Sequence, residues 1–123
     1  MGELKISDAE WQVMEVIWQA GQATAADVIA SLSKTDWNHR TIRTLLARLV
    51  EKGALATKTS GNRYIYRPVI TRKRCVKQAS KTFVEKVFAG DVNSLLAHFV
   101  RDAKISKEEL VELRKLLDEK LDK

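Results

Sequence analysis

Three helix starts in quick succession constrain the first half of this chain most strongly. Ser7 and Glu10 form a capping box, Thr24 is followed by Asp27 at the third helical position, and Asn38 can cap a third helix. Each start precedes apolar residues at helical spacing, which predicts a compact unit of three short helices. The three stripes are Trp11, Met14, Ile17 and Trp18; then Ala25, Val28, Ile29 and Leu32; then Ile42, Leu45, Leu46, Leu49 and Val50.

After Gly53 the period of the pattern changes. Residues 54–59 and 63–69 are β-like, and the second run is rich in aromatic and β-branched residues. Ser60-Gly61-Asn62 lies between them and suits a hairpin loop, because Gly and Asn accept positive φ. Three helices followed by a two-stranded hairpin is the element order of a winged helix-turn-helix.

The chain is expected to be helical from residue 71 to its end. Thr71 can cap a helix that runs to about Ala89, Asp91 or Asn93 starts a shorter one, and Ser106 opens a capping box before the last. The predicted fold class is therefore mostly α with a small β-hairpin (α+β). We expect a winged helix-turn-helix domain over residues 1–70 and a helical dimerisation domain over residues 71–123.

The helices after residue 70 carry apolar stripes that nothing in the sequence would cover. A lone unit of this size buries too little surface for stability, and two packed copies would bury more. Helix-turn-helix proteins also commonly bind two-fold sites as dimers. The alternative is that these helices fold back onto the first unit. The predicted dimerisation residues are Phe83, Val87, Leu95, Leu96, Phe99, Leu110, Leu113 and Leu117.

The positive charge is concentrated in one third of the chain. Residues 34–77 hold twelve basic and two acidic residues, a net charge of +10, whereas the remainder holds ten basic and fourteen acidic residues, a net charge of −4. Such a segment is an electrostatic footprint for nucleic-acid phosphate. The alternative is a solvated basic face without a partner.

The third predicted helix is the best candidate for base recognition. A helix in the major groove contacts bases with its N-terminal residues, where arginine suits guanine and threonine suits adenine or thymine. We therefore predict that Arg40, Thr41 and Arg43 contact bases. The predicted backbone contacts are Asn38 and His39 at the helix start, and Lys58, Arg63 and Arg67 around the hairpin loop.

Enzymatic, cofactor and metal functions are not indicated. The two histidines, His39 and His98, lie in different predicted units, and no phosphate-binding glycine motif occurs. The single cysteine, Cys75, excludes an internal disulfide framework and any multi-cysteine metal site. Beside Arg74, Cys75 could have a lowered pKa and sense oxidants, although we favour a packing role.

Three segments resemble the penicillinase-repressor (BlaI/MecI) family. They are ISDAEWQVMEVIW at the start, TDWNHRTIRTLLARLVEKGAL around the third helix, and FVEKVFAGDVNSLLAHFV towards the end. The resemblance covers nearly the whole chain. It implies a homodimeric winged-helix transcriptional repressor that occupies an inverted-repeat operator in double-stranded DNA.

The resemblance also implies a mode of relief. In members that control β-lactam antibiotic resistance, a membrane-bound sensor activates cleavage of the repressor in its dimerisation domain. The matching bond lies between His98 and Phe99, where the family's pattern has Asn before that Phe. The partners implied are thus operator DNA, a second copy and a sensor-activated protease.

One other class of function stays open at the level of sequence. A winged-helix architectural or protein-interaction module would bind DNA nonspecifically through the same basic face. The polar N-terminus lacks an apolar signal core and no apolar run could span a membrane, so a cytoplasmic location without membrane insertion is expected.

Overall fold

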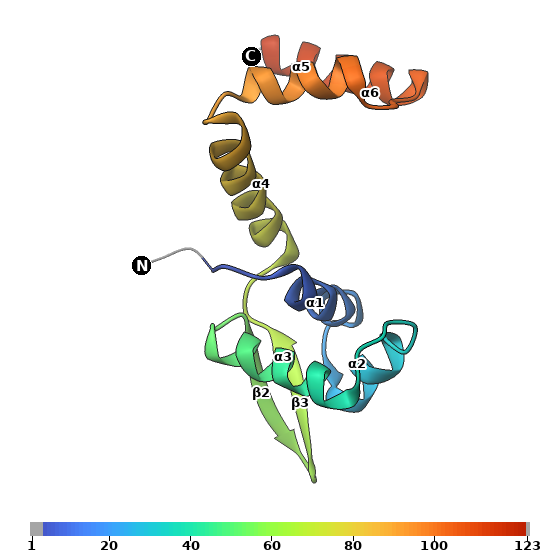
Figure 1. Cartoon of the computed structure of the whole chain (residues 1–123), viewed down its shortest axis with the longest axis vertical. Helices are drawn as coiled ribbons and strands as arrows, with labels where there is room; N and C mark the ends of the chain where they lie inside the picture. The colour runs from blue at the N-terminus through green and yellow to red at the C-terminus, as the bar shows by residue number, and fades with distance from the viewer. Residues whose placement is uncertain (1–3, 123) are drawn as a thin grey trace. The chain divides into compact units, whose positions relative to one another are not determined.

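The computed structural model describes residues 4–122, and Figure 1 shows the order of its elements. The chain forms two compact units, and the boundary falls between Ala79 and Ser80. The first unit holds α1 (Asp8–Ala20), α2 (Ala25–Ser31) and α3 (His39–Glu51). All three predicted starts are confirmed. Ser7 and Thr24 each form a full capping box, and Asn38 Oδ1 accepts from the Thr41 backbone N–H at 2.8 Å.

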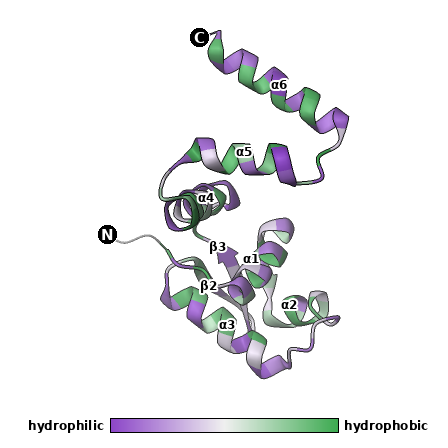
Figure 2. Cartoon of the chain, turned by 45° about the horizontal axis from the view of Figure 1, so that its top comes forward, coloured by the Kyte–Doolittle hydropathy of each residue, from purple (hydrophilic) through white to green (hydrophobic). Residues whose placement is uncertain are grey.

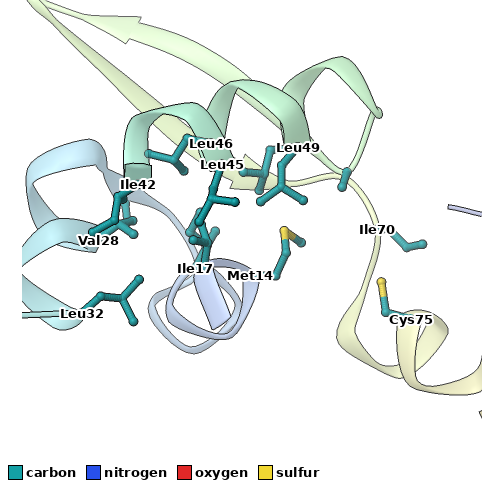
Figure 3. Close-up of a cluster of buried hydrophobic side chains, with 14 residues drawn as sticks. Met14, Ile17, Val28, Leu32, Ile42, Leu45, Leu46, Leu49, Ile70 and Cys75 are labelled. Atoms are coloured by element: carbon teal, nitrogen blue, oxygen red, sulfur yellow. The ribbon is translucent and has the colours of Figure 1, made fainter. Parts of the chain in front are cut away.

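The core of the first unit lies where the helical stripes meet. Figure 3 shows Met14 and Ile17 of α1 facing Leu45, Leu46 and Leu49 of α3. Val28 of α2 is also fully buried, whereas Trp11 and Trp18 of α1 pack only partly buried against the cluster. Local helix signals and tertiary burial therefore agree on most inward residues, although Val13 of α1 is fully buried and was not predicted.

The sheet has one strand more than the sequence predicted. β2 (Leu55–Ser60) and β3 (Arg63–Pro68) form the expected antiparallel hairpin, with Ser60 opposite Arg63. β1 (Ala23–Thr24) pairs with the other edge of β3, so the strand order is β1-β3-β2. A strand of two residues has no periodicity of its own, and only its pairing with β3 reveals it.

The helix after the hairpin, α4 (Arg72–Phe88), is anchored to the first unit by its first turns. Cys75 is buried in the core cluster, and Arg72 Nε donates to Glu15 Oε1 at 2.8 Å. Trp18 Nε1 donates to the Ile70 carbonyl at 3.0 Å. The compact first unit therefore extends to Ala79, past the boundary after residue 70 that the sequence suggested.

An ion pair between α1 and the C-cap of α3 closes the other side of this core. Glu10 is 1% exposed, and Lys52 Nζ lies 2.6 Å from its Oε1. Burial raises the pKa of the Glu10 carboxyl, but the hydrogen bonds from Lys52 and the Ser7 backbone outweigh this and lower it overall. Glu10 was predicted only as a capping residue, and Lys52 was counted in the basic segment.

We expect Lys52→Met to lower the free energy of unfolding by about 1–3 kcal/mol, because it leaves a buried carboxylate without its counter-ion. The folded pKa of Glu10 is depressed, so its contribution is present above the unfolded pKa and is lost as the pH falls through the folded pKa. The variant should therefore also unfold at a higher pH in an acid titration. Denaturant melts at pH 7 measure the loss, and Arg48→Met on the same helix is the control. Equal losses for the two variants would contradict the pairing.

The second unit contains the end of α4, then α5 (Val92–Asp102) and α6 (Lys107–Leu121). Asp91 caps α5, and Ser106 forms the predicted capping box with Glu109. No described residue from Ser80 to Asp122 is buried in the single chain. Hydrophobic segments nonetheless recur along both helices (Figure 2).

Candidate nucleic-acid interface

The α3 helix presents one face to the core and the other to solvent. Ile42, Leu45, Leu46 and Leu49 are buried, which fixes the rotation of the helix about its axis. The predicted base-contacting residues lie on the opposite side and are all exposed, as are the two residues at the helix start: Asn38, His39, Arg40, Thr41 and Arg43. The exposed N-terminal turns of α3 therefore carry two guanidinium groups, an imidazole and a hydroxyl.

The N-cap leaves part of Asn38 available for other contacts. Its Oδ1 accepts from the Thr41 N–H, so the amide NH₂ remains free to donate to a phosphate oxygen. One turn further on, the Thr44 hydroxyl donates to the Arg40 carbonyl at 3.0 Å. Thr44 is exposed on the same face as Arg40 and was missed, although its spacing of four residues would have placed it there.

The register of the hairpin shows how its basic residues are arranged. Cross-strand partners share a face of a sheet, and here Lys58 lies opposite Ile65, two residues from Arg63 and from Arg67. Lys58, Arg63 and Arg67 therefore project from the same face. The other face continues the core, because it carries Leu55, which is buried.

A hollow of about 260 Å³ lies between α3 and the hairpin. Arg43 of α3 and Arg63 of β3 both line it, although the sequence predicted different roles for them. Its other lining residues come from the hairpin and from the start of α2: Asn62, Tyr64, Tyr66, Thr24, Ala25 and Ala26. Tyr64 was not predicted as a site residue, although strand alternation places it on the same face as Tyr66.

Not all of the basic segment is free for an external anion. Lys52 is paired with buried Glu10, and Arg72 is bonded to Glu15. Both were counted in the predicted electrostatic footprint. The sequence could not separate them from the others, because their partners lie 42 and 57 residues away on α1.

The remaining candidates for chemistry have structural roles. Cys75 is 3% exposed, and burial raises the pKa of its thiol against a smaller lowering effect of Arg74. A thiolate sensor needs the opposite shift, so the packing interpretation holds. In α5, His98 Nδ1 lies 3.2 Å from Asp102 Oδ2, and the His98 ring contacts Phe88 and Phe99.

The predicted dimerisation residues lie in the second unit and on its part of α4. Seven of the eight are among the exposed large hydrophobic side chains of the chain: Phe83, Val87, Leu96, Phe99, Leu110, Leu113 and Leu117. Leu95 is half-buried. Within α4, Val76 is exposed and the adjacent Cys75 is buried. Among the described helices, none combines the length and the apolar character needed to cross a bilayer.

A three-helix core, a capped helix with an exposed basic start and an adjoining basic hairpin together define a winged helix-turn-helix protein. A family model described as Penicillinase repressor matches residues 6–119. The chain belongs to this family, whose members are transcriptional repressors and not enzymes.

Two named relatives are similar in sequence to nearly the whole chain. The methicillin resistance regulatory protein MecI of Mammaliicoccus sciuri is 37% identical over 117 residues, which cover 94% of this chain and 95% of MecI. The penicillinase repressor of Bacillus licheniformis is 38% identical over 116 residues, covering 94% and 91%.

Part of this chain also resembles a relative solved in complex with a half-operator. The monomeric form of Bacillus licheniformis BlaI, bound to the blaP half-operator, superposes with a TM-score of 0.52 at 40% identity. The match covers 59% of this chain and 92% of that one.

Proposed function

We propose that this protein is a sequence-specific transcriptional repressor that occupies an inverted-repeat operator as a homodimer in the cytoplasm. One observation carries the DNA-binding part. The buried stripe of α3 turns Arg40, Thr41 and Arg43 outward at the N-terminal end of a helix beside a basic hairpin. The half-operator complex of the BlaI relative supports the same use of this fold.

In this proposal the contacts divide between specificity and positioning. Arg40, Thr41 and Arg43 read base edges in the major groove, where the arginine fork matches guanine. Asn38 and His39 at the helix start hold the sugar-phosphate backbone, together with the hairpin residues Lys58, Arg63 and Arg67. Phosphate contacts of this kind fix the register of the helix without selecting a sequence.

The dimer is supported by the apolar side chains of the second unit. Its described residues include no buried one, yet eleven large hydrophobic side chains are at least 39% exposed there. A single copy therefore has no core in this region, and a two-fold partner would supply one. Two joined modules would each place one α3 on one half-site of the operator.

We also propose that cleavage between His98 and Phe99 relieves repression. This bond lies inside α5, and a protease that binds extended chain needs the helix to open first. Local opening costs least where few apolar groups are buried, and α5 has no buried residue in the single chain. The cut would separate α6 from the rest of the dimerisation surface.

The division between specificity and positioning gives a direct test. Arg63→Ala should weaken binding to the operator and to scrambled DNA by the same factor, because a phosphate contact is lost from each. The slope of log K against log salt should fall by about one unit per lost contact. Titrations at several salt concentrations measure both quantities, with the exposed Lys120→Ala as control. An unchanged slope with an altered sequence preference would contradict the assignment.

The same titrations test sequence specificity itself. The operator is first recovered by selection from random duplexes. The intact protein should then prefer the recovered duplex over its scrambled version by about 10³-fold or more. Equal affinity for the two would instead support a nonspecific architectural module.

A further inference from the structure

We propose that the hollow between α3 and the hairpin binds one backbone phosphate of the operator, and that the Tyr64 hydroxyl is a specific ligand of that phosphate. The inference rests on the proposed function and deepens it. It assigns a role to a residue that neither the charge pattern nor the helix pattern singled out. It also joins Arg43 and Arg63 to one structural feature.

The position of Tyr64 follows from the alternation of β3. Tyr64 and Tyr66 share the face of the hairpin that carries buried Leu55. Tyr66 packs partly buried against the core, whereas Tyr64 is one step nearer the tip and 61% exposed. Near its tip, this face of the hairpin no longer contacts the core. There the exposed Tyr64 lines the hollow with its ring and hydroxyl.

The donors around the hollow suit a phosphodiester. Arg63 contributes a guanidinium group, Tyr64 a hydroxyl and Asn62 an amide, and none of the described lining residues is acidic. Arg43 lines the α3 side of the hollow and keeps its proposed role at the bases. No hydrogen bond to another described part of the chain engages the Arg43, Arg63 or Tyr64 side chains. Several donors can satisfy several acceptor oxygens of one phosphodiester at once.

The nearest carboxylate does not compete for these donors. Asp27 accepts from the Thr24 backbone N–H at 3.0 Å, and its pKa is lowered by hydrogen bonds from Thr24 and, to a smaller extent, by Arg63. Its charge is therefore directed to the capping box of α2. Arg63 is held near the hollow without a direct ion pair.

The test couples a protein change to a DNA change. Tyr64→Phe removes only the hydroxyl, and we expect it to weaken binding to operator and scrambled DNA alike, by about threefold to tenfold. Single phosphates of the operator are then replaced by neutral methylphosphonates. At one phosphate in each half-site the two changes should be non-additive, because they remove the same contact.

A matched control completes the design. Thr59→Val removes a hydroxyl from the same face, opposite Tyr64 but outside the hollow, and should leave affinity unchanged. Additivity of Tyr64→Phe with every methylphosphonate would overturn the proposal. Failure of the wild type to prefer its operator would instead overturn the proposed function.

Discussion

A chain that ends after Ala79 is expected to be monomeric and to bind the full operator about 10²–10⁴-fold more weakly than the intact protein. One module holds one half-site, whereas a dimer makes the second contact effectively intramolecular. The loss corresponds to about 3–5 kcal/mol. The truncation keeps Ile70, Cys75 and the bond between Arg72 and Glu15, so the first unit retains its core. Sedimentation measures the mass, and operator titration measures the affinity.

A point substitution in the full chain tests the role of dimerisation without removing any residues. Leu117 is 56% exposed, so Leu117→Asp should leave the single chain folded while it disrupts the packing of two copies. Lys115→Asp places the same side chain on the opposite face of α6, two residues away, and should keep the dimer. A monomeric variant that still binds the full operator as tightly as the intact protein would show that dimerisation does not drive occupancy.

Arg43→Ala is expected to reduce operator affinity by about 2–6 kcal/mol. A bidentate arginine contributes about 1–3 kcal/mol of discrimination, and a two-fold dimer loses it in both half-sites. Arg43 is exposed on α3, while the adjacent Ile42 is buried and fixes the direction in which the helix faces. Scrambled DNA should lose much less affinity, so the specificity ratio should fall with the operator affinity. Competition titrations with both duplexes measure this ratio.

Arg48→Ala is the matched control for this prediction, since it makes the same change on the same helix. Arg48 is exposed but lies in the last turn of α3, away from the N-terminal residues that we expect to enter the groove. It should affect both duplexes equally or not at all. If Arg43→Ala also weakened both duplexes equally, Arg43 would be a phosphate contact and Arg40 would be the main candidate for base recognition.

The reliable part of the sequence prediction concerns short-range signals. The caps at Ser7, Thr24, Asn38 and Ser106 each join a side chain to a backbone N–H three residues later, so the sequence alone contains both partners. The buried face of α3 follows from spacing in the same way. The base-contacting candidates could be named because they are the residues that this spacing leaves outside the core.

Features that depend on contacts between distant segments could not be predicted from the sequence and became visible only in the folded structure. β1 exists because Ala23 and Thr24 meet β3, and no pattern within two residues could indicate it. The boundary after Ala79 follows from the burial of Cys75 beside residues of other elements. The second unit was predicted as helical, yet only the structure shows that none of its described residues is buried in one chain.

By itself, the sequence determined the helix starts, the hairpin, the exposed basic start of α3 and the family, because these depend on neighbouring residues or on the order of segments. The tertiary structure decided how the charges are used. Lys52 and Arg72 bond to α1, whereas Arg43 and Arg63 meet around one hollow with Tyr64. The physical reason is that an ion pair or a binding hollow depends on distances in space, and residues 42 or 57 positions apart acquire such distances only when the chain folds.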